Sequence, residues 1–359
     1  MAETNNKMKI GIVGTGNIAG PYVKDLKTSP QIDIGGVADA FPEKAQAFGE
    51  EYDLKVYDSL DALLADDSIE LVANLTIHHA HFDITTRCLN AGKHVYSEKP
   101  LALTYQEAKA LVELAERNGV RLGASPFTFM GKAQQAAWRR VEAGELGTVR
   151  LAYAEVNWGR IESWHPNPAP FYEVGPLWDV GVYPLTFLTA VFGPVRKVTA
   201  YGKTLKADRT TLDGDPFELN GPDFLVCLLE HTSGVLTRLT ANFYVTQKSK
   251  QESAIEIHGD NKSLYLSSWF LPNGKVEVAE FNKPYEPLPN VDAPNEMPWG
   301  TGIRDMVDGL LGNRPHRATG AQAAHIVEVL EAAYTSVSTG DAVEVRSDFV
   351  TPEVVGRKQ

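Results

Sequence analysis

The sequence predicts an α/β protein made of two parts. The first third of the chain alternates apolar, strand-like runs with helical patterns, which is typical of a doubly wound parallel sheet with helices on both faces. After about Pro126 the pattern changes to successive strand-like runs joined by short polar turns, which predicts a second α/β domain with a large open, mostly antiparallel sheet. We therefore expect one domain over residues 1–126 and a second over 127–359, with a C-terminal helix able to pack back on the first.

The first predicted strand, Met8–Val13, leads directly into Gly14-Thr15-Gly16-Asn17-Ile18-Ala19. The glycines allow a sharp turn and a close approach of the backbone, and the helix that begins near Asn17 offers free N–H groups to a pyrophosphate. A second apolar run, Ile32–Ala38, ends at Asp39, roughly twenty positions beyond the glycines, where a carboxylate can accept hydrogen bonds from ribose hydroxyls. This combination predicts a Rossmann dinucleotide-binding domain in which Gly14, Gly16, Asn17, Ile18 and Asp39 contact the cofactor.

Asp39 also bears on the choice of cofactor. Its carboxylate would repel an added 2′-phosphate, and neither Ala40 nor Phe41 supplies the arginine that commonly accommodates one. We expect NAD in preference to NADP.

The remaining N-terminal elements complete the alternation of helices and strands. The predicted helices are Pro42–Tyr52, Leu60–Leu64 with Asp58 or Ser59 as its cap, His81–Asn90, and a helix from the capping box at Thr104 to Gly119. The predicted strands are residues 55–57, 69–75, 94–96 and 120–123.

The second part of the chain is dominated by strands. Helices are predicted over residues 133–143, 177–192 and 319–338, with a proline-rich loop at 164–170. Strands are predicted over residues 149–158, 195–202, 223–230, 235–244, 254–258 and 263–267. A sheet with helices on one face exposes its other face, so we expect a homo-oligomer built through this C-terminal sheet.

Composition narrows the classes of partner. The net charge of −12 over 359 residues argues against a nucleic-acid partner, because phosphate binding needs a basic face. We find no apolar stretch approaching a membrane span, and residues 1–7 are polar without a signal-peptide core, so no membrane partner is expected. Cys88 and Cys227 are far apart within apolar segments and are typical of core residues in a reducing compartment, which favours a cytoplasmic protein.

Two short motifs could carry chemistry. Glu98-Lys99-Pro100 ends the strand that begins at His94, and ligands bind at the carboxyl ends of strands in open α/β sheets. Asp179 and Tyr183 are four positions apart and therefore share one face of a helix. Taken singly, each has an ordinary alternative: a solvated lysine, an aspartate at a helix start and a half-buried tyrosine.

Together these segments resemble the glucose–fructose oxidoreductase / inositol dehydrogenase (Gfo/Idh/MocA) family. The resemblance spans essentially the whole chain and is carried by the glycine motif, by Asn90-Ala91-Gly92-Lys93-His94-Val95 leading into Glu98-Lys99-Pro100, and by Asp179-Val180-Gly181-Val182-Tyr183. It implies a Rossmann domain, a C-terminal α/β domain with an open sheet, and oxidation or reduction of a sugar-like alcohol with a nicotinamide cofactor.

The resemblance also implies site residues. The lysine of the family's Glu-Lys-Pro motif and the polar pair of its Asp-x-x-x-His motif correspond here to Lys99, Asp179 and Tyr183 as the catalytic set. The loop that runs past the nicotinamide ribose in the family holds Thr76, His78 and His81. With Glu98 and Lys99, these three residues join the expected cofactor contacts.

The chain departs from the commoner family pattern in three places. Tyr183 replaces the histidine, as in members that look like glucose–fructose oxidoreductase, xylose dehydrogenase and dihydrodiol dehydrogenase. The glycine run before the Asp motif is reduced to Gly175, and Pro126-Phe127-Thr128-Phe129 stands where many members carry a polar Asn-x-Arg-like segment.

The residue types suggest a mechanism. A tyrosine with an ordinary pKa of about 10 is a poor base at neutral pH. The Lys99 ammonium and the positive nicotinamide would lower the pKa of Tyr183, so Tyr183 is expected to take the hydroxyl proton while hydride leaves the same carbon. Lys99 would hold the substrate oxygen and Asp179 a second hydroxyl.

Two further segments have competing interpretations. Trp164, His165 and Asn167 lie in the proline-rich loop and could stack on and hydrogen-bond to a sugar, or form only a rigid surface turn. The cluster His78-His79-Ala80-His81 lacks a neighbouring Asp or Cys, so we expect no metal there.

The function predicted from these observations is an NAD-dependent dehydrogenase acting on a secondary alcohol of a sugar, glycoside or cyclitol. Two alternatives remain open: an enzyme that retains NAD and uses transient oxidation to cleave a glycosidic bond, and a catalytically silent NAD-binding sensor.

Overall fold

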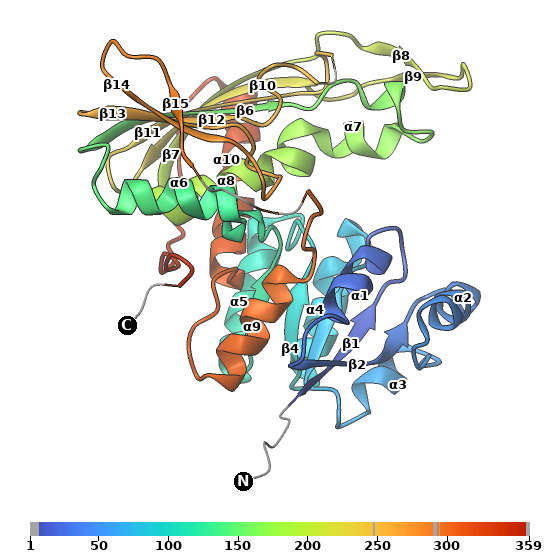
Figure 1. Ribbon diagram of the computed structural model, residues 1–359. Helices are drawn as coiled ribbons and strands as arrows, with labels where there is room; N and C mark the ends of the chain where they lie inside the picture. The colour runs from blue at the N-terminus through green and yellow to red at the C-terminus, as the bar shows by residue number, and fades with distance from the viewer. Residues whose placement is uncertain (1–6, 247, 290–292, 294, 357–359) are drawn as a thin grey trace. The chain divides into compact units, whose positions relative to one another are not determined.

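The computed structural model describes residues 7–246, 248–289, 293 and 295–356 (Figure 1). Its contacts divide the chain into two compact units. Unit 1 comprises Met1–Phe127 and Pro298–Val327, and unit 2 comprises Thr128–Met297 and Glu328–Gln359. Residues 1–6, which carry most of the polar N-terminal stretch considered above, lie outside the described residues.

Unit 1 contains the predicted doubly wound parallel sheet. All pairs in its five strands are parallel, in the order β2-β1-β3-β4-β5. The strands are β1 (Met8–Val13), β2 (Ile32–Ala38), β3 (Leu71–Asn74), β4 (His94–Ser97) and β5 (Leu122–Ala124). The predicted strand at 55–57 is reduced to a single bridge, Val37 to Val56.

The helices of this unit follow the local sequence signals closely. They are α1 (Ala19–Leu26), α2 (Pro42–Tyr52), α3 (Leu60–Leu64), the 3-10 turn η1 (His78–Ala80), α4 (His81–Asn90), α5 (Tyr105–Arg117) and α9 (Thr301–Leu311). Ser59 caps α3 by accepting from the Ala62 N–H at 3.1 Å, and Thr104 caps α5 by accepting from the Glu107 N–H at 3.2 Å. Helix α9 was not predicted from the sequence.

The strand order places a crevice at one edge of this sheet. The chain runs from β1 outward to β2 and then returns to β3 on the other side of β1, which makes the carboxyl ends of β1 and β3 a topological switch point. Gly14 directly follows β1, and Thr76 lies just after β3.

Unit 2 contains a nine-stranded sheet in the order β15-β14-β13-β12-β6-β11-β10-β7-β16. Every pair is antiparallel except β6 with β11, which confirms the predicted mostly antiparallel sheet. The strands are β6 (Val149–Asn157), β7 (Val195–Lys203), β10 (Phe224–His231), β11 (Leu236–Asn242), β12 (Ile255–Gly259), β13 (Lys262–Leu266), β14 (Val276–Glu280), β15 (Glu286–Pro287) and β16 (Val343–Glu344).

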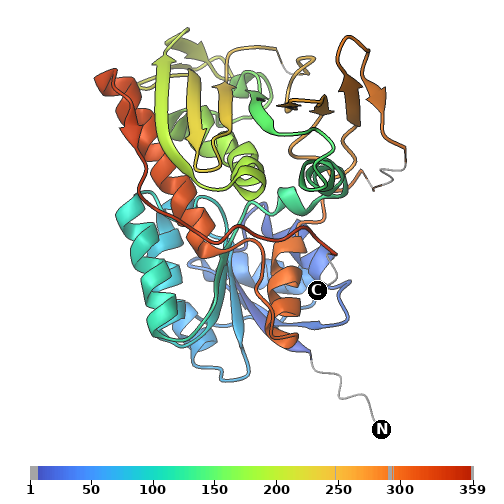
Figure 2. The same ribbon diagram turned by 90° about the vertical axis from the view of Figure 1, so that its left-hand side faces the viewer.

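Helices cover one face of this sheet (Figures 1 and 2). They are α6 (Lys132–Glu142), α7 (Ala169–Pro176), the π turn η4 (Leu177–Gly181), α8 (Val182–Phe192) and the part of α10 (Gly320–Thr339) beyond Val327. The Ser336 hydroxyl of α10 accepts a hydrogen bond from the Ala200 N–H of β7 at 2.9 Å, which ties this helix to the sheet.

The segment Ala169–Phe192 corrects one expectation. Its helical turns together are long and apolar enough to cross a membrane, whereas the sequence analysis found no such stretch. Of its most apolar window, 72% is buried inside the protein, and Gly175, with φ of 82°, kinks it between α7 and η4. It is therefore a core helical segment of unit 2.

A two-stranded hairpin stands apart from the large sheet. It pairs β8 (Asp208–Thr210) with β9 (Pro216–Glu218) in the excursion between β7 and β10 (Figure 1). The sequence analysis did not predict it.

Candidate functional site

A cavity of about 590 Å³ opens at the switch point of unit 1. Its wall is formed by the segments that follow β1, β2 and β3, together with the adjoining helix starts. The lining residues are Val13, Gly14, Gly16, Asn17, Ile18, Ala38, Asp39, Ala40, Phe41, Pro42, Lys44, Asp58, Ser59, Leu60, Leu75, Thr76, Ile77, Ala80, Ile84 and Arg87. Six predicted cofactor residues are among them: Gly14, Gly16, Asn17, Ile18, Asp39 and Thr76.

Glycine is needed at the two positions of the motif for different structural reasons. Gly14 has φ of +94°, and a Cβ there would lie 2.8 Å from the backbone of Leu75 and Thr76. A Cβ at Gly16 would meet no protein atom within 4 Å. Gly14 is thus required by the turn itself, while Gly16 leaves open space beside the start of α1, where a bound phosphate could approach the backbone.

Asp39 is held by donors of its own chain. Its Oδ2 accepts hydrogen bonds from the Thr15 N–H at 2.7 Å and the Thr15 hydroxyl at 2.8 Å, and Oδ1 accepts from the Phe41 N–H at 3.0 Å. Burial alone would raise the pKa of Asp39, but these hydrogen bonds outweigh it and the pKa lies below its ordinary value. The carboxylate is therefore fixed and ionised at neutral pH.

Two cations in the cavity wall were missed by the sequence analysis. Lys44, in the first turn of α2, places Nζ 4.5 Å from the centre of the Phe41 ring. Arg87, in α4, forms an ion pair with Asp61 of 2.5 Å. Neither residue belongs to a sequence motif. Their positions in the cavity wall depend on how α2 and α4 pack, which local patterns do not predict.

The remaining predicted cofactor residues lie outside this lining. His81 is buried, with Nδ1 2.6 Å from the Pro100 carbonyl and Nε2 3.0 Å from the Thr76 carbonyl, so its ring joins the segments after β3 and β4. Burial lowers the pKa of His81 despite these two carbonyls. The His78 ring packs against His79 with centroids 4.2 Å apart.

Glu98 is the centre of a network that we call the Glu98 network. Its Oε1 accepts hydrogen bonds from the hydroxyls of Tyr22 at 2.5 Å and Ser125 at 2.9 Å, and its Oε2 accepts from the Lys99 N–H at 3.0 Å. Tyr22 is fully buried, and burial followed by the nearby Glu98 raises its pKa. The network fixes the backbone at Lys99 from α1 and from the end of β5.

Metal binding finds no support among the described residues. They contain no group of three or more His, Cys, Asp or Glu side chains arranged to hold an ion.

In unit 2, Asp179 and Tyr183 sit at the junction of the π turn and α8. Asp179 is within η4 and Tyr183 is in the first turn of α8. The Tyr183 ring stacks on Trp269 at 5.6 Å and meets the edge of Phe270 at 5.3 Å. Trp269 is itself fully buried and donates its indole N–H to the Glu155 carbonyl at 2.8 Å, so Tyr183 rests on a fixed aromatic support.

The proline-rich loop presents an aromatic group. The Trp164 side chain is 40% exposed and meets His165 edge-on at 5.4 Å. Both rings pack against Phe171, at 6.2 and 4.7 Å. Asn167 is exposed, and its N–H donates to His165 Nδ1 at 3.1 Å. The polar and apolar groups expected for a sugar site are thus on one short loop.

Comparison with known proteins identifies the family. Residues 8–125 match the oxidoreductase family with an NAD-binding Rossmann fold, and residues 134–265 match the GFO/IDH/MocA C-terminal domain. The chain belongs to this oxidoreductase family.

The curated relatives include proteins named as dehydrogenases. The chain is 30% identical over 203 residues to D-xylose 1-dehydrogenase (NADP(+)) of Hypocrea jecorina, a match covering 50% of this chain and 52% of that protein. It is also 30% identical over 202 residues to trans-1,2-dihydrobenzene-1,2-diol dehydrogenase of Macaca fuscata fuscata, covering 55% of this chain and 60% of the relative. The matches thus span between half and three fifths of these relatives.

Solved structures agree on the fold. An NAD-binding oxidoreductase from Klebsiella pneumoniae superposes with a TM-score of 0.84 at 20% sequence identity, covering 95% of this chain and all of that one.

Proposed function

We propose that this protein is an NAD-dependent dehydrogenase that oxidises a secondary alcohol of a sugar, glycoside or cyclitol, or reduces the corresponding carbonyl. The observation that carries the proposal is the cavity at the switch point of unit 1, whose glycine turn and ionised Asp39 fit a dinucleotide. The names of the xylose and dihydrodiol dehydrogenases support alcohol oxidation as the reaction.

The choice of NAD over NADP rests on Asp39. Three protein donors hold this carboxylate in place, so a 2′-phosphate would meet a fixed negative charge. Lys44 and Arg87 in the same wall act in the opposite sense, but Arg87 is already paired with Asp61. NAD is therefore the proposed cofactor.

A bound nicotinamide would supply the hydride acceptor. In the proposal, Gly14, Gly16, Asn17, Ile18 and Thr76 hold the dinucleotide. His78, His81 and Glu98 shape the segments at its nicotinamide end.

The chain's own residues would move the proton and orient the alcohol. The Tyr183 phenolate accepts the proton of the reacting alcohol, Lys99 holds the same alcohol oxygen, and Asp179 holds a second hydroxyl. Trp164, His165 and Asn167 bind the rest of the sugar. The stacking of Tyr183 on Trp269 favours one orientation of the phenol ring, which such a transfer requires.

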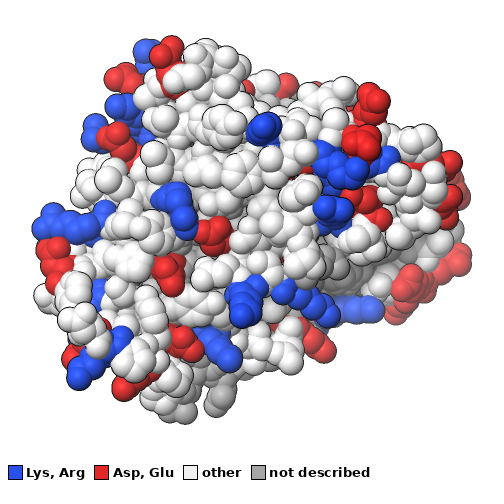
Figure 3. All heavy atoms as spheres, turned by 90° about the horizontal axis from the view of Figure 1, so that it is seen from above, with Lys and Arg blue, Asp and Glu red and all other residues white. Residues whose placement is uncertain are grey.

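We further propose that the uncovered face of the large sheet joins two copies of this chain. Tyr201, Leu228 and Leu236, on β7, β10 and β11, are 61, 55 and 51% exposed. Figure 3 shows charged side chains of both signs scattered on the surface seen from above, with broad uncharged stretches between them. Such a face fits a protein–protein interface better than a nucleic acid or a membrane surface.

A cytoplasmic location is the corresponding proposal. Cys88 and Cys227 are both buried as free thiols, and burial raises the pKa of each to about 12. Free thiols fit a reducing compartment.

The test is reduction of NAD and, separately, NADP by the purified protein across a panel of pyranoses, glycosides and inositols. Turnover with NAD on any of these compounds is expected. NADH binding with no net turnover on the panel, together with cleavage of a glycoside, would establish the cofactor-retaining alternative. NADH binding with neither reaction would contradict an enzymatic role.

A further inference from the structure

The β8–β9 hairpin carries an arginine in an unusual place. Asp208 and Thr210 on either side of it are exposed, whereas the Arg209 side chain has no exposed surface. Lysine and arginine are rarely buried unless they are paired, so the partners of Arg209 indicate what the hairpin holds.

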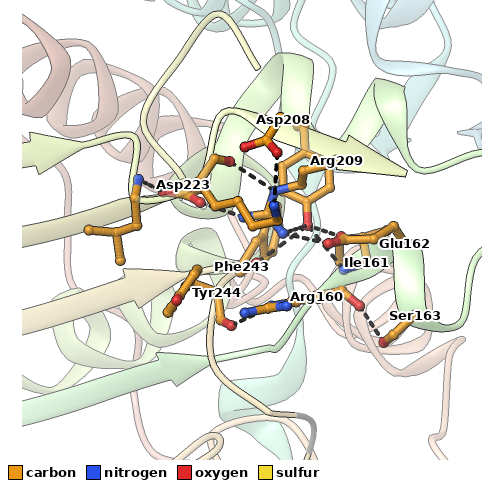
Figure 4. Close-up of polar contacts among 12 residues, drawn as sticks. Arg160, Ile161, Glu162, Ser163, Asp208, Arg209, Asp223, Phe243 and Tyr244 are labelled. Carbon is orange, nitrogen blue, oxygen red and sulfur yellow. Dashed lines mark hydrogen bonds and ion pairs between the residues drawn. The ribbon is translucent and has the colours of Figure 1, made fainter. Parts of the chain in front are cut away.

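These partners form a group that we call the Arg209 cluster: Glu162, Tyr172, Arg209 and Asp223 (Figure 4). Arg209 Nη1 donates to Glu162 Oε1 at 2.6 Å and to the Tyr172 hydroxyl at 2.9 Å, while Nη2 pairs with Asp223 Oδ2. Asp223 has no exposed side-chain surface and Glu162 only 11%. One guanidinium thus joins the hairpin to two other parts of unit 2.

Glu162 and Tyr172 lie on opposite sides of the proline-rich loop. Glu162 is in the 3-10 turn η3 (Ile161–Ser163), just before residues 164–170, and Tyr172 is in α7, just after them. The Tyr172 hydroxyl donates to Glu162 Oε2 and accepts from the Ile161 N–H at 3.3 Å. Burial and then Glu162 raise the pKa of Tyr172, so the phenol keeps the proton that it donates.

A second anchor fixes the N-terminal end of the loop, where Glu162 lies. Arg160 Nε donates to the Tyr244 carbonyl at 3.0 Å, and the guanidinium lies 4.7 Å from the centre of the Tyr244 ring. The Ser163 hydroxyl donates to the Arg160 carbonyl at 2.6 Å (Figure 4). The loop is therefore closed at both ends by buried or stacked contacts, while Trp164 between them remains exposed.

We propose that Arg209 is a positioning residue for substrate recognition. By joining Glu162 to Tyr172 it holds residues 164–170 as a ready-formed wall, on which Trp164 stacks against a sugar ring and Asn167 meets its hydroxyls. Arg209 itself does not contact the substrate. This proposal rests on the proposed function, because the proposed function supplies the sugar that the fixed loop would bind.

The physical basis is the conformational entropy of the loop. A loop ordered before binding does not lose that entropy when the substrate arrives, so the substrate binds more tightly. Loss of the anchor should raise the KM for the alcohol and leave cofactor binding unchanged, because the cofactor cavity is lined by unit 1 alone.

The geometry of the cluster also predicts which substitutions fail. Arg209 reaches Glu162 with one nitrogen and Asp223 with another, a bridge that the single ammonium of lysine cannot reproduce. Arg209→Lys is thus expected to lose the anchoring of the loop although it keeps the positive charge. Lys206 is the matched control, since it lies just before β8 in an exposed ion pair with Asp208.

The experiment compares Arg209→Lys, Arg209→Met and Lys206→Met with the unmodified full-length protein. We would measure KM and kcat for the best alcohol of the panel at saturating NAD, the dissociation constant of NADH, and amide hydrogen exchange over residues 160–172. For Arg209→Lys we expect kcat/KM to fall about 10- to 100-fold, mainly through KM. Exchange over 160–172 should accelerate, NADH binding should be unchanged, and Lys206→Met should match the unmodified protein.

Unchanged KM and unchanged exchange in Arg209→Lys would overturn the proposal. If Arg209→Met does not fold, Arg209→Lys and Glu162→Gln carry the same test. Should the unmodified protein oxidise no alcohol of the panel, the proposed function fails. The exchange comparison would then still support or overturn the anchoring of the loop.

Discussion

Each unit holds a carboxylate that accepts a hydrogen bond from a buried tyrosine, but the other donors to the two carboxylates differ. In unit 1, Glu98 accepts hydrogen bonds from the hydroxyls of Tyr22 and Ser125 and from the Lys99 N–H. In unit 2, Glu162 is bound by the Tyr172 hydroxyl and by the guanidinium of Arg209.

The difference indicates two uses of a buried acid. Hydroxyl and backbone donors do not neutralise the charge of a carboxylate, so the hydrogen bonds from Tyr22 and Ser125 hold Glu98 as a negative charge next to the proposed catalytic Lys99. The charge of a carboxylate that is paired with an arginine is neutralised within the structure, and such a pair is suited to anchoring a loop. We interpret the Glu98 network as part of the site's electrostatics and the Arg209 cluster as part of its architecture.

The largest effect on stability is expected from breaking the charged cluster. Arg209→Met leaves Asp223 and Glu162 buried without their cation, which should lower the free energy of unfolding by about 3–5 kcal/mol. Denaturant unfolding measures this value. Lys206→Met, at the exposed pair, should change it by less than about 1 kcal/mol. Equal losses in the two variants would contradict the account.

Acid should destabilise both units through their buried histidines, of which His231 and His316 have the most strongly lowered pKa values. Burial lowers the pKa of His231 in unit 2 and of His316 in unit 1 to about 4, from an ordinary 6.5. Between these values the unfolded chain binds more protons than the folded one, so stability falls as pH drops from 6.5 to 4. Each histidine can contribute up to about 3 kcal/mol.

Urea unfolding across this pH range tests the effect. His231→Gln should reduce the pH dependence of the stability of unit 2, which is measured by hydrogen exchange in β10. The pH dependence of the stability of unit 1 should be unchanged. A variant with the unmodified slope would show that other groups cause the acid sensitivity.

Breaking the Glu98 network should lower stability less than breaking the Arg209 cluster, but it should also lower turnover. Tyr22→Phe removes one hydrogen bond to the Glu98 carboxylate, so the free energy of unfolding should fall by about 1.5–3 kcal/mol. The kcat should fall because the backbone at Lys99 is less well fixed, with the NADH dissociation constant nearly unchanged. A loss of NADH affinity without a loss of kcat would place the role of Tyr22 in binding.

The smallest expected change is in cofactor preference. Asp39→Ala removes an ionised acceptor from the cavity wall, so the ratio of kcat/KM for NAD over NADP should fall by about 10- to 100-fold. Asp33→Ala, at an exposed position of β2, the strand that Asp39 follows, should leave this ratio unchanged. An unmodified protein that prefers NADP would refute the assignment to Asp39.

Local signals in the sequence predicted much of unit 1. The bounds of α2, α3 and α4 and the caps Ser59 and Thr104 agree with the structure because each depends on residues a few positions apart. The parallel sheet followed from the alternation of such elements.

Contacts between distant segments could not be predicted in this way. No periodicity links Arg209 to Glu162, which is 47 positions earlier, or Tyr183 to Trp269, and the β8–β9 hairpin has strands of only three residues. The π turn at Asp179 was also missed, since its pattern of apolar residues is that of an ordinary helix. The family motifs indicated which residues belong to the candidate site, while only the structure showed the contacts that hold them in place.

The most direct test of the account is turnover by Tyr183→Phe. This variant keeps the ring that stacks on Trp269 and removes only the phenol oxygen that is proposed to accept the proton as a phenolate. With the best alcohol and saturating NAD, we expect kcat to fall by about 10²- to 10⁴-fold while NADH binding is unchanged. Normal turnover by Tyr183→Phe would contradict the assignment and leave Lys99 as the proton carrier.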